Sequence, residues 1–240
     1  MLRAGLGVLA LAGAIIAAPM VQAQGAAGEP LKIGAIISLT GPGAGLGNPQ
    51  RQGMMLAEKT INAAGGVNGR PIRIVIEDDG SKPDIAKSKA ERLMYDEKVA
   101  AIIGPSLTAS TGAVAAITNA ERLPTLSFTG LGPRIELTYK SLFHLLPSQD
   151  LNAKAMLEYS TKELKAKKIG ILHDTGYGQV VTNQLNVHRQ AYGVEFVAVE
   201  KFEVGASDVS AQAATVRAAS PDVGFVIATS AVPFRNARQG

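Results

Sequence analysis

The sequence predicts a doubly wound α/β protein, and three observations support this prediction. Short apolar runs alternate with amphipathic stretches along most of the chain, which is typical of parallel strands whose connecting helices cover both faces of a sheet. Turns containing Gly or Pro separate these runs. The chain has 240 residues, of which 46% are hydrophobic and 18% charged, so it can bury a sizeable core.

Each apolar run is assigned to a strand by its length and its β-branched residues. The expected strands cover residues 31–37, 72–77, 99–103, 125–128, 142–146, 168–172, 194–199 and 223–228. Apolar residues spaced three or four apart predict the helices between them. Three of these helices cover residues 48–64, 150–166 and 208–219. A fourth begins at Pro83, a fifth follows Ser106, and a sixth runs from near Val181 to Tyr192. The inward faces are expected to include Met54, Ala57, Ile61 and Ala64 in the first helix and Ala153, Leu157 and Leu164 in the helix over 150–166.

The sharpest break in this alternation is Pro147-Ser148-Gln149. It divides the chain into two predicted lobes, residues 31–146 and 147–240. Residues 24–30 are expected to be a short extension ahead of the first strand.

The first 23 residues have the pattern of a cleavable secretory signal peptide. Arg3 is followed by an apolar run over residues 4–18, and Val21-Gln22-Ala23 places small residues at the cleavage positions. We expect cleavage near Ala23 and export of the mature chain. An N-terminal membrane anchor is the alternative, but 15 apolar residues rich in Ala and Gly are short for a span.

Composition excludes several kinds of site. The chain has no Cys, which rules out disulfides, thiolate metal sites and a catalytic thiol. It has no Trp and only 5% aromatic residues, which argues against stacking platforms for nucleic acid. The net charge is +4 with both signs interspersed, so we expect no nucleic-acid partner.

Motif searches favour a binding protein over an enzyme. The Gly-rich segment 41–47 has Leu46 where a dinucleotide fingerprint needs Gly, and no Walker A lysine pattern is present. Glu77-Asp78-Asp79 could hold a hard cation, although a solvated turn is the commoner structure for such a run. His144, His173 and His188 share no metal-ligand spacing, and His188 is interpreted as a packed residue. We therefore expect no cofactor, no metal and no catalytic residues.

A ligand site is expected where parallel strands end. Four turns there are polar and small: 38–43, 106–111, 127–130 and 174–178. The segment 108–111 opens a helix directly after a buried strand, so its amides and hydroxyls suit a carboxylate. The alternative is ordinary N-capping by Thr108 or Ser110.

Several segments, in order, resemble the branched-chain amino-acid-type periplasmic binding proteins. They are Ser38-Leu39-Thr40-Gly41-Pro42, Ile61-Asn62-Ala63-Ala64-Gly65-Gly66-Val67-Asn68-Gly69, Glu77-Asp78-Asp79, Ile103-Gly104-Pro105, Leu123-Pro124, His173-Asp174 and Tyr177-Gly178. The resemblance implies two Rossmann-like lobes joined by a hinge that close on an amino acid or a similar small carboxylate or amide. It also implies a monomeric, periplasmic subunit of an ABC importer that delivers its ligand to a membrane permease.

By this resemblance, Thr108, with Ala109 beside it, is expected to contact the ligand carboxylate. Ser127, Thr129 and Gly130 match the segment that serves the ligand amine and carboxylate, and Tyr177 matches the second-lobe tyrosine that reaches across the closed cleft. The chain departs from the pattern over residues 128–131, has no aromatic lid near Leu46 and has no Tyr over 228–232. These departures weaken the case for a leucine-type ligand.

The resemblance also implies further strands after residue 240, so the second lobe is expected to be incomplete. Two other functions remain open at this point. One is a ligand sensor of the same fold coupled to signalling, and the other is an exported enzyme on a Rossmann-like scaffold.

Overall fold

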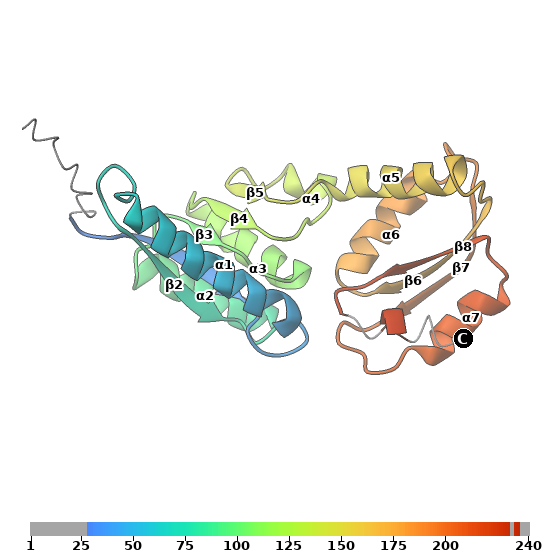
Figure 1. The fold of residues 1–240 in the computed structure, drawn as a ribbon, viewed down its shortest axis with the longest axis horizontal. Helices are drawn as coiled ribbons and strands as arrows, with labels where there is room; N and C mark the ends of the chain where they lie inside the picture. The colour runs from blue at the N-terminus through green and yellow to red at the C-terminus, as the bar shows by residue number, and fades with distance from the viewer. Residues whose placement is uncertain (1–27, 231–232, 236–240) are drawn as a thin grey trace, which may run out of the picture.

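The structure confirms the predicted class, with two lobes that each contain a parallel sheet between helices. This computed structural model describes residues 28–230 and 233–235. The lobes lie side by side along the long axis of the molecule (Figure 1). The predicted signal peptide, residues 1–23, lies outside the described residues.

The first lobe is built on a five-stranded sheet in the order β2-β1-β3-β4-β5. Its strands are β1 (Leu31–Ile37), β2 (Ile72–Asp78), β3 (Ile102–Ile103), β4 (Thr125–Ser127) and β5 (Leu142–His144). Its helices are α1 (Ala44–Ala63), α2 (Pro83–Tyr95), α3 (Thr108–Ala120) and the short α4 (Pro133–Glu136). All strand pairs are parallel. Because the order reverses between β1 and β3, the loops after these two strands diverge and leave a crevice at the carboxyl edge of the sheet.

Alternate residues of β1 pack on opposite faces of this sheet. On one face, Ile36 packs with Leu93 of α2 and Val114 of α3. On the other, Ala35 and Ile37 pack with Met54 of α1. The period of two along the strand therefore supplies both layers of helices with apolar contacts.

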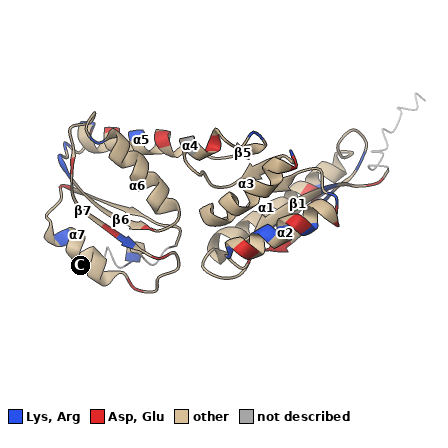
Figure 2. Ribbon diagram, turned by 180° about the vertical axis from the view of Figure 1, so that it is seen from behind, with Lys and Arg blue, Asp and Glu red and all other residues tan. Residues whose placement is uncertain are grey.

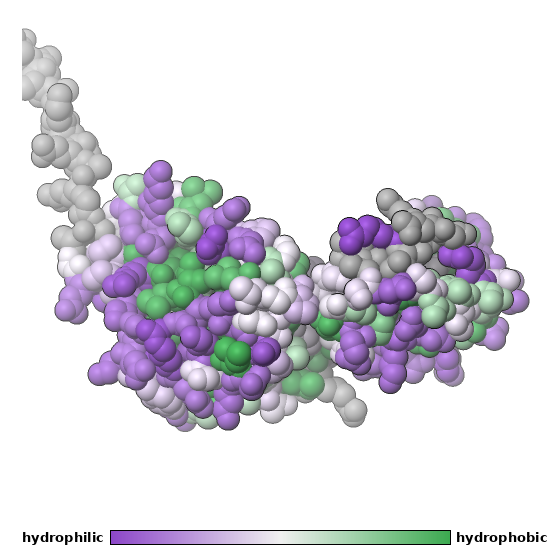
Figure 3. All heavy atoms as spheres, turned by 90° about the horizontal axis from the view of Figure 1, so that it is seen from below, coloured by the Kyte–Doolittle hydropathy of each residue, from purple (hydrophilic) through white to green (hydrophobic). Residues whose placement is uncertain are grey.

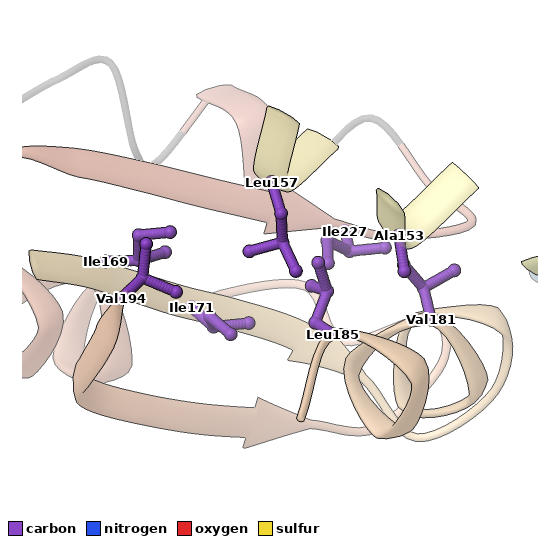
Figure 4. Close-up of a cluster of buried hydrophobic side chains, with 8 residues drawn as sticks. All are labelled: Ala153, Leu157, Ile169, Ile171, Val181, Leu185, Val194 and Ile227. Atoms are coloured by element: carbon purple, nitrogen blue, oxygen red, sulfur yellow. The ribbon is translucent and has the colours of Figure 1, made fainter. Parts of the chain in front are cut away.

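The second lobe has a three-stranded parallel sheet in the order β7-β6-β8 among the described residues. Its strands are β6 (Lys168–Asp174), β7 (Glu195–Phe202) and β8 (Val223–Ile227), and its helices are α5 (Gln149–Lys162), α6 (Tyr177–His188) and α7 (Ser210–Ala218). Side chains from α5, α6, β6 and β8 form its main core cluster (Figure 4). On the opposite face Leu172 of β6 packs with residues of α7.

The predicted inward face of α1 was wrong. Of its four residues only Met54 is buried, and Ala57, Ile61 and Ala64 are exposed. The inward positions are instead taken by polar side chains: Glu58 Oε2 accepts a hydrogen bond from Ile74 N at 2.7 Å, and Asn62 Oδ1 accepts one from Ile72 N at 2.7 Å. This helix packs against the backbone of an edge strand, so it needs hydrogen-bonding groups there.

Some predicted boundaries also differ from the structure. β3 is confined to two residues, α5 ends at Lys162, and α6 ends before Tyr192. Because α5 ends early, the predicted core residue Leu164 is 49% exposed. The helix α4 was not predicted, since its single turn lacks any apolar period.

Charged side chains are distributed unevenly over this fold. Lys, Arg, Asp and Glu are conspicuous along α2, while the ends of α3 and α6 that approach the other lobe are almost free of them (Figure 2). Hydrophobic residues also gather in a patch on the surface of the first lobe (Figure 3). Within residues 28–230 and 233–235, none of the helices is long and apolar enough to cross a membrane.

Candidate ligand-binding cleft

A cavity of about 320 Å³ lies between the two lobes, at the carboxyl ends of both sheets, and we call it the inter-lobe cavity. Its apolar lining from the first lobe is Leu46, Leu107, Phe128 and Leu146, and its polar lining from the first lobe is Gln50, Ser106, Thr108 and Thr129. The second lobe contributes Tyr177, Ala228 and Thr229. The described lining carries no charged side chain. A volume of this size suits a small organic molecule.

The start of α3 supplies hydrogen-bond donors to this cavity. Leu107 is the N-cap residue, and no side chain caps the helix. The first N–H groups of any helix lack intrahelical acceptors, and the helix dipole adds partial positive charge there. Thr108 Oγ1 is buried and has no hydrogen-bond partner among the described residues. The alternative of capping by Thr108 or Ser110 was therefore wrong, and the start of α3 can accept a carboxylate.

The loop after β4 is held by hydrogen bonds among small hydroxyl groups. Ser127 Oγ accepts a hydrogen bond from Thr129 N at 3.0 Å, and Thr111 Oγ1 lies 3.1 Å from Ser127 Oγ and 3.0 Å from Thr129 Oγ1. Thr129 lines the inter-lobe cavity, whereas Ser127 and Gly130 do not. Ser127 therefore fixes the position of Thr129 by a hydrogen bond without itself lining the inter-lobe cavity.

Two carboxylates order the loop after β1. Asp78 accepts hydrogen bonds from Leu39 N at 2.8 Å and from Thr40 Oγ1 at 2.7 Å, and Asp79 accepts one from Ser38 Oγ at 2.7 Å. Burial raises the pKa of Asp78, but hydrogen bonds from Gly80, Thr40 and Leu39 outweigh it and leave the pKa below its ordinary value. The described residues contain no group of three His, Asp or Glu side chains suited to a metal ion. The acidic run therefore acts as a loop anchor.

Tyr177 begins α6 and faces the inter-lobe cavity from the second lobe. Burial raises the pKa of its phenol above the ordinary 10.0, and the nearby Asp174 acts in the same direction, against a hydrogen bond with Asn152. The phenol is consequently neutral at physiological pH and can donate a hydrogen bond to a ligand.

Asp174, at the end of β6, is 1% exposed. It links two segments of the second lobe that line the inter-lobe cavity. Its Oδ1 accepts hydrogen bonds from Gly176 N at 3.0 Å and Gly178 N at 2.7 Å. Its Oδ2 accepts from Thr229 N at 2.6 Å and Thr229 Oγ1 at 2.7 Å. One carboxylate therefore joins the start of α6 to the loop after β8.

A smaller cavity of about 120 Å³ adjoins the first and shares Thr108 and Tyr177 with it. Ala109 lines this smaller cavity only. Close by, Gly205 of the second lobe is in contact with Pro42 of the first. The contact is so close that a Cβ added to Gly205 would lie 2.7 Å from Pro42 Cγ.

Sequence reasoning missed several lining residues. Leu46 and Gln50 could have been found, because they lie four apart on the helix that follows β1 and so share a face. Thr229 could not, because its place depends on Asp174, 55 residues earlier in the chain. The histidine interpreted as packed, His188, pairs with Asp150, with 2.5 Å between Nε2 and Oδ1.

A family model described as periplasmic binding protein matches residues 30–239. The chain belongs to the periplasmic binding protein family. A curated relative from Pseudomonas aeruginosa, named amino acid binding protein, is 28% identical over 186 residues, which cover 77% of this chain and 50% of the relative.

Solved structures of a ligand-binding receptor and of a transporter substrate-binding protein share the fold. An extracellular ligand-binding receptor from Rhodopseudomonas palustris superposes with a TM-score of 0.79 at 26% identity, covering 88% of this chain and 58% of that one. A branched-chain amino acid transporter substrate-binding protein from Streptococcus pneumoniae, solved with isoleucine, gives a TM-score of 0.73 at 28% identity and covers 82% and 56%. The chain thus spans between half and three-fifths of the length of these relatives. The family that the sequence resembles and the α/β fold with two Rossmann-like lobes that this resemblance implies are confirmed.

Proposed function

We propose that this protein is a periplasmic solute-binding receptor of an ABC importer, exported by its N-terminal signal peptide. It binds an amino acid or a similar small carboxylate or amide between its lobes and delivers it to a membrane permease. The observation that carries the proposal is the uncapped start of α3, where Thr108 Oγ1 has no hydrogen-bond partner in the described part of the chain, facing Tyr177 across the inter-lobe cavity. Its similarity to an amino acid binding protein and to an isoleucine-bound transporter substrate-binding protein supports it.

The mechanism follows from the two walls of the cavity. A ligand carboxylate accepts hydrogen bonds from the start of α3 and from Thr108, with Ala109 beside them. Tyr177 adds its phenol from the other lobe, a contact that only the closed form can make. A ligand shifts an equilibrium only by its difference in affinity for the two states, so Tyr177 couples binding to closure. Because both walls come from one chain, we expect the receptor to act as a monomer.

Ligand-dependent stabilisation tests the proposal. A ligand at 100 times its Kd stabilises the folded state by about 2.7 kcal/mol. We expect a rise in melting temperature with at least one compound of a panel of amino acids, their amides and aromatic acids. No shift with any compound would contradict the proposed function.

The role of Tyr177 is tested by Tyr177→Ala. We expect affinity for the ligand found in the panel to fall at least tenfold, and the melting temperature without ligand to fall as well, because the ring of Tyr177 packs against the core cluster of the second lobe. Affinities are therefore compared at a temperature at which each variant is folded. The control is Tyr159→Ala, because Tyr159 lies on α5 and is 59% exposed. Equal affinities for the two variants in calorimetry would rule out the role of Tyr177.

A further inference from the structure

Gln50 is the polar side chain of α1 that lines the inter-lobe cavity, and its carboxamide is held in one orientation. Ser106 Oγ accepts a hydrogen bond from Ser38 N at 3.1 Å. Its single proton then goes to Gln50 Oε1, 2.5 Å away. Ser106 is 1% exposed, so this contact is protected from competing water.

The orientation of the carboxamide decides what it can offer a ligand. Its oxygen accepts a hydrogen bond from Ser106, and its Nε2 has no hydrogen-bond partner among the described residues. The N–H groups of Gln50 are therefore available to a ligand, while the oxygen has already used one of its two lone pairs.

Apolar side chains also line the cavity that Gln50 faces. They include Leu46, one turn earlier on α1, Phe128 and Leu146. Gln50 is partly buried, and a donor with apolar side chains beside it favours a ligand that brings an acceptor over one that leaves the donor unpaired.

We propose that Gln50 is a specificity-determining residue, which selects ligands carrying a hydrogen-bond acceptor on their otherwise apolar part. The ligand class is a small carboxylate that carries a further hydroxyl or carbonyl oxygen. This rests on the proposed function, since it assumes that the inter-lobe cavity holds the ligand and that the carboxylate lies at α3.

Pairs of compounds of nearly equal size, in which one member carries the acceptor, test the proposal. We choose threonine with valine, asparagine with leucine, and 4-hydroxybenzoate with 4-methylbenzoate. Calorimetry on the whole chain should show the acceptor member of at least one pair binding at least tenfold more tightly. Gln50→Leu should abolish or reverse that preference. Gln50→Glu, which keeps the acceptor for Ser106 but loses the donor, should also abolish it.

The control is Gln52→Leu, the same substitution at an exposed position of the same helix, which should keep the wild-type ratio. The ratio of two affinities is insensitive to a general loss of stability. If compounds bind but the wild-type protein shows no preference, or if Gln50→Leu retains it, the role of Gln50 is refuted and the proposed function stands. If no member of any pair and no compound of the wider panel binds, the proposed function fails and this inference fails with it.

Discussion

The starts of α3 and α6 line the same cavity from opposite lobes, but they differ in how their N–H groups are satisfied. At α6, Asp174 supplies a carboxylate from within the lobe and binds the N–H groups of Gly176 and Gly178. At α3 no side chain caps the helix, and Thr108 Oγ1 has no partner among the described residues. Of these two helix starts, only that of α3 has donors available for a ligand carboxylate among the described residues. In the second lobe the carboxylate of Asp174 already accepts the hydrogen bonds of the N–H groups at the start of α6. The group that this lobe presents to a ligand is the phenol of Tyr177.

Asp78 is the first-lobe counterpart of Asp174. Asp78, at the end of β2, accepts four hydrogen bonds, as Asp174 does at the end of β6. Each joins its own loop to the loop after a neighbouring strand. Asp78, however, is partly exposed, whereas Asp174 is buried. Water can replace lost partners at the first and not at the second.

The largest effect is expected from Asp174→Asn, which turns one of two buried acceptors into a donor facing other donors. We expect a loss of about 3 kcal/mol in the free energy of unfolding, because hydrogen bonds to a charged group are lost and buried donors stay unpaired. Asp78→Asn should cost only about 1 kcal/mol, since solvent reaches that site. Urea unfolding of both variants measures the difference, and equal losses would show that burial does not distinguish the two carboxylates.

The next effect concerns the close approach of a helix to a strand end in each lobe. A Cβ on Gly178 would clash with the carbonyl oxygen of Ile227, and one on Gly47 with that of Ser38. Gly178→Ala and Gly47→Ala should each cost roughly 1–3 kcal/mol, because a helix must shift away from backbone.

Gly45→Ala is the matched control, since a Cβ on Gly45 meets no neighbouring segment. It should stabilise the protein by about 0.4–1 kcal/mol by restricting the unfolded chain. Thermal unfolding of all three variants measures this, and a loss at Gly45 as large as at Gly178 would show that close approach is not the cause.

Thr108→Val separates binding from stability at α3. Its hydroxyl has no hydrogen-bond partner within residues 28–230 and 233–235, so we expect the free energy of unfolding to change by less than about 0.5 kcal/mol. Ligand affinity should fall about tenfold, which corresponds to about 1.4 kcal/mol. A large loss of stability with unchanged affinity would show that the Thr108 hydroxyl serves the fold, as Asp174 does at α6, and does not bind the ligand.

The smallest effect is the response to acid. Hydrogen bonds from Lys154 and then from His188 lower the pKa of Asp150 below its ordinary 3.8 in the second lobe, and Lys32 and then Arg92 lower the pKa of Glu97 below 4.5 in the first. A depressed folded-state pKa contributes stability that is present above the unfolded value and lost as the pH falls through the folded value.

Asp150→Asn should therefore lower stability at pH 7 by about 0.2–1 kcal/mol, as for a partly exposed ion pair. Below a pH of about 4 the difference from the wild-type protein should shrink. Melting temperatures measured from pH 7 down to pH 3 follow this change, and a difference that grows in acid would contradict the assignment.

Much of the fold was predictable, because strands and helices follow from local periodicity. The buried stripe of α2, which is Ala86, Ala90 and Leu93, and the start of α3 at Thr108 agree with the predicted elements. The inward face of α1 was mispredicted, because that helix binds the backbone of β2 through Glu58 and Asn62. Apolar spacing carries no information about such polar packing.

The sequence by itself determined the α/β class, the approximate order of elements and the polar turns at which a ligand site is expected, since burial patterns depend on near neighbours. Only the tertiary structure decided which polar groups are occupied. Asp174 reaches Thr229 across 55 positions, and Ser106 reaches Gln50 across 56. Those pairings leave Thr108 Oγ1 and Gln50 Nε2 without a hydrogen-bond partner among the described residues. They arise from the order of strands in each sheet, which places distant loops side by side and which no local pattern encodes.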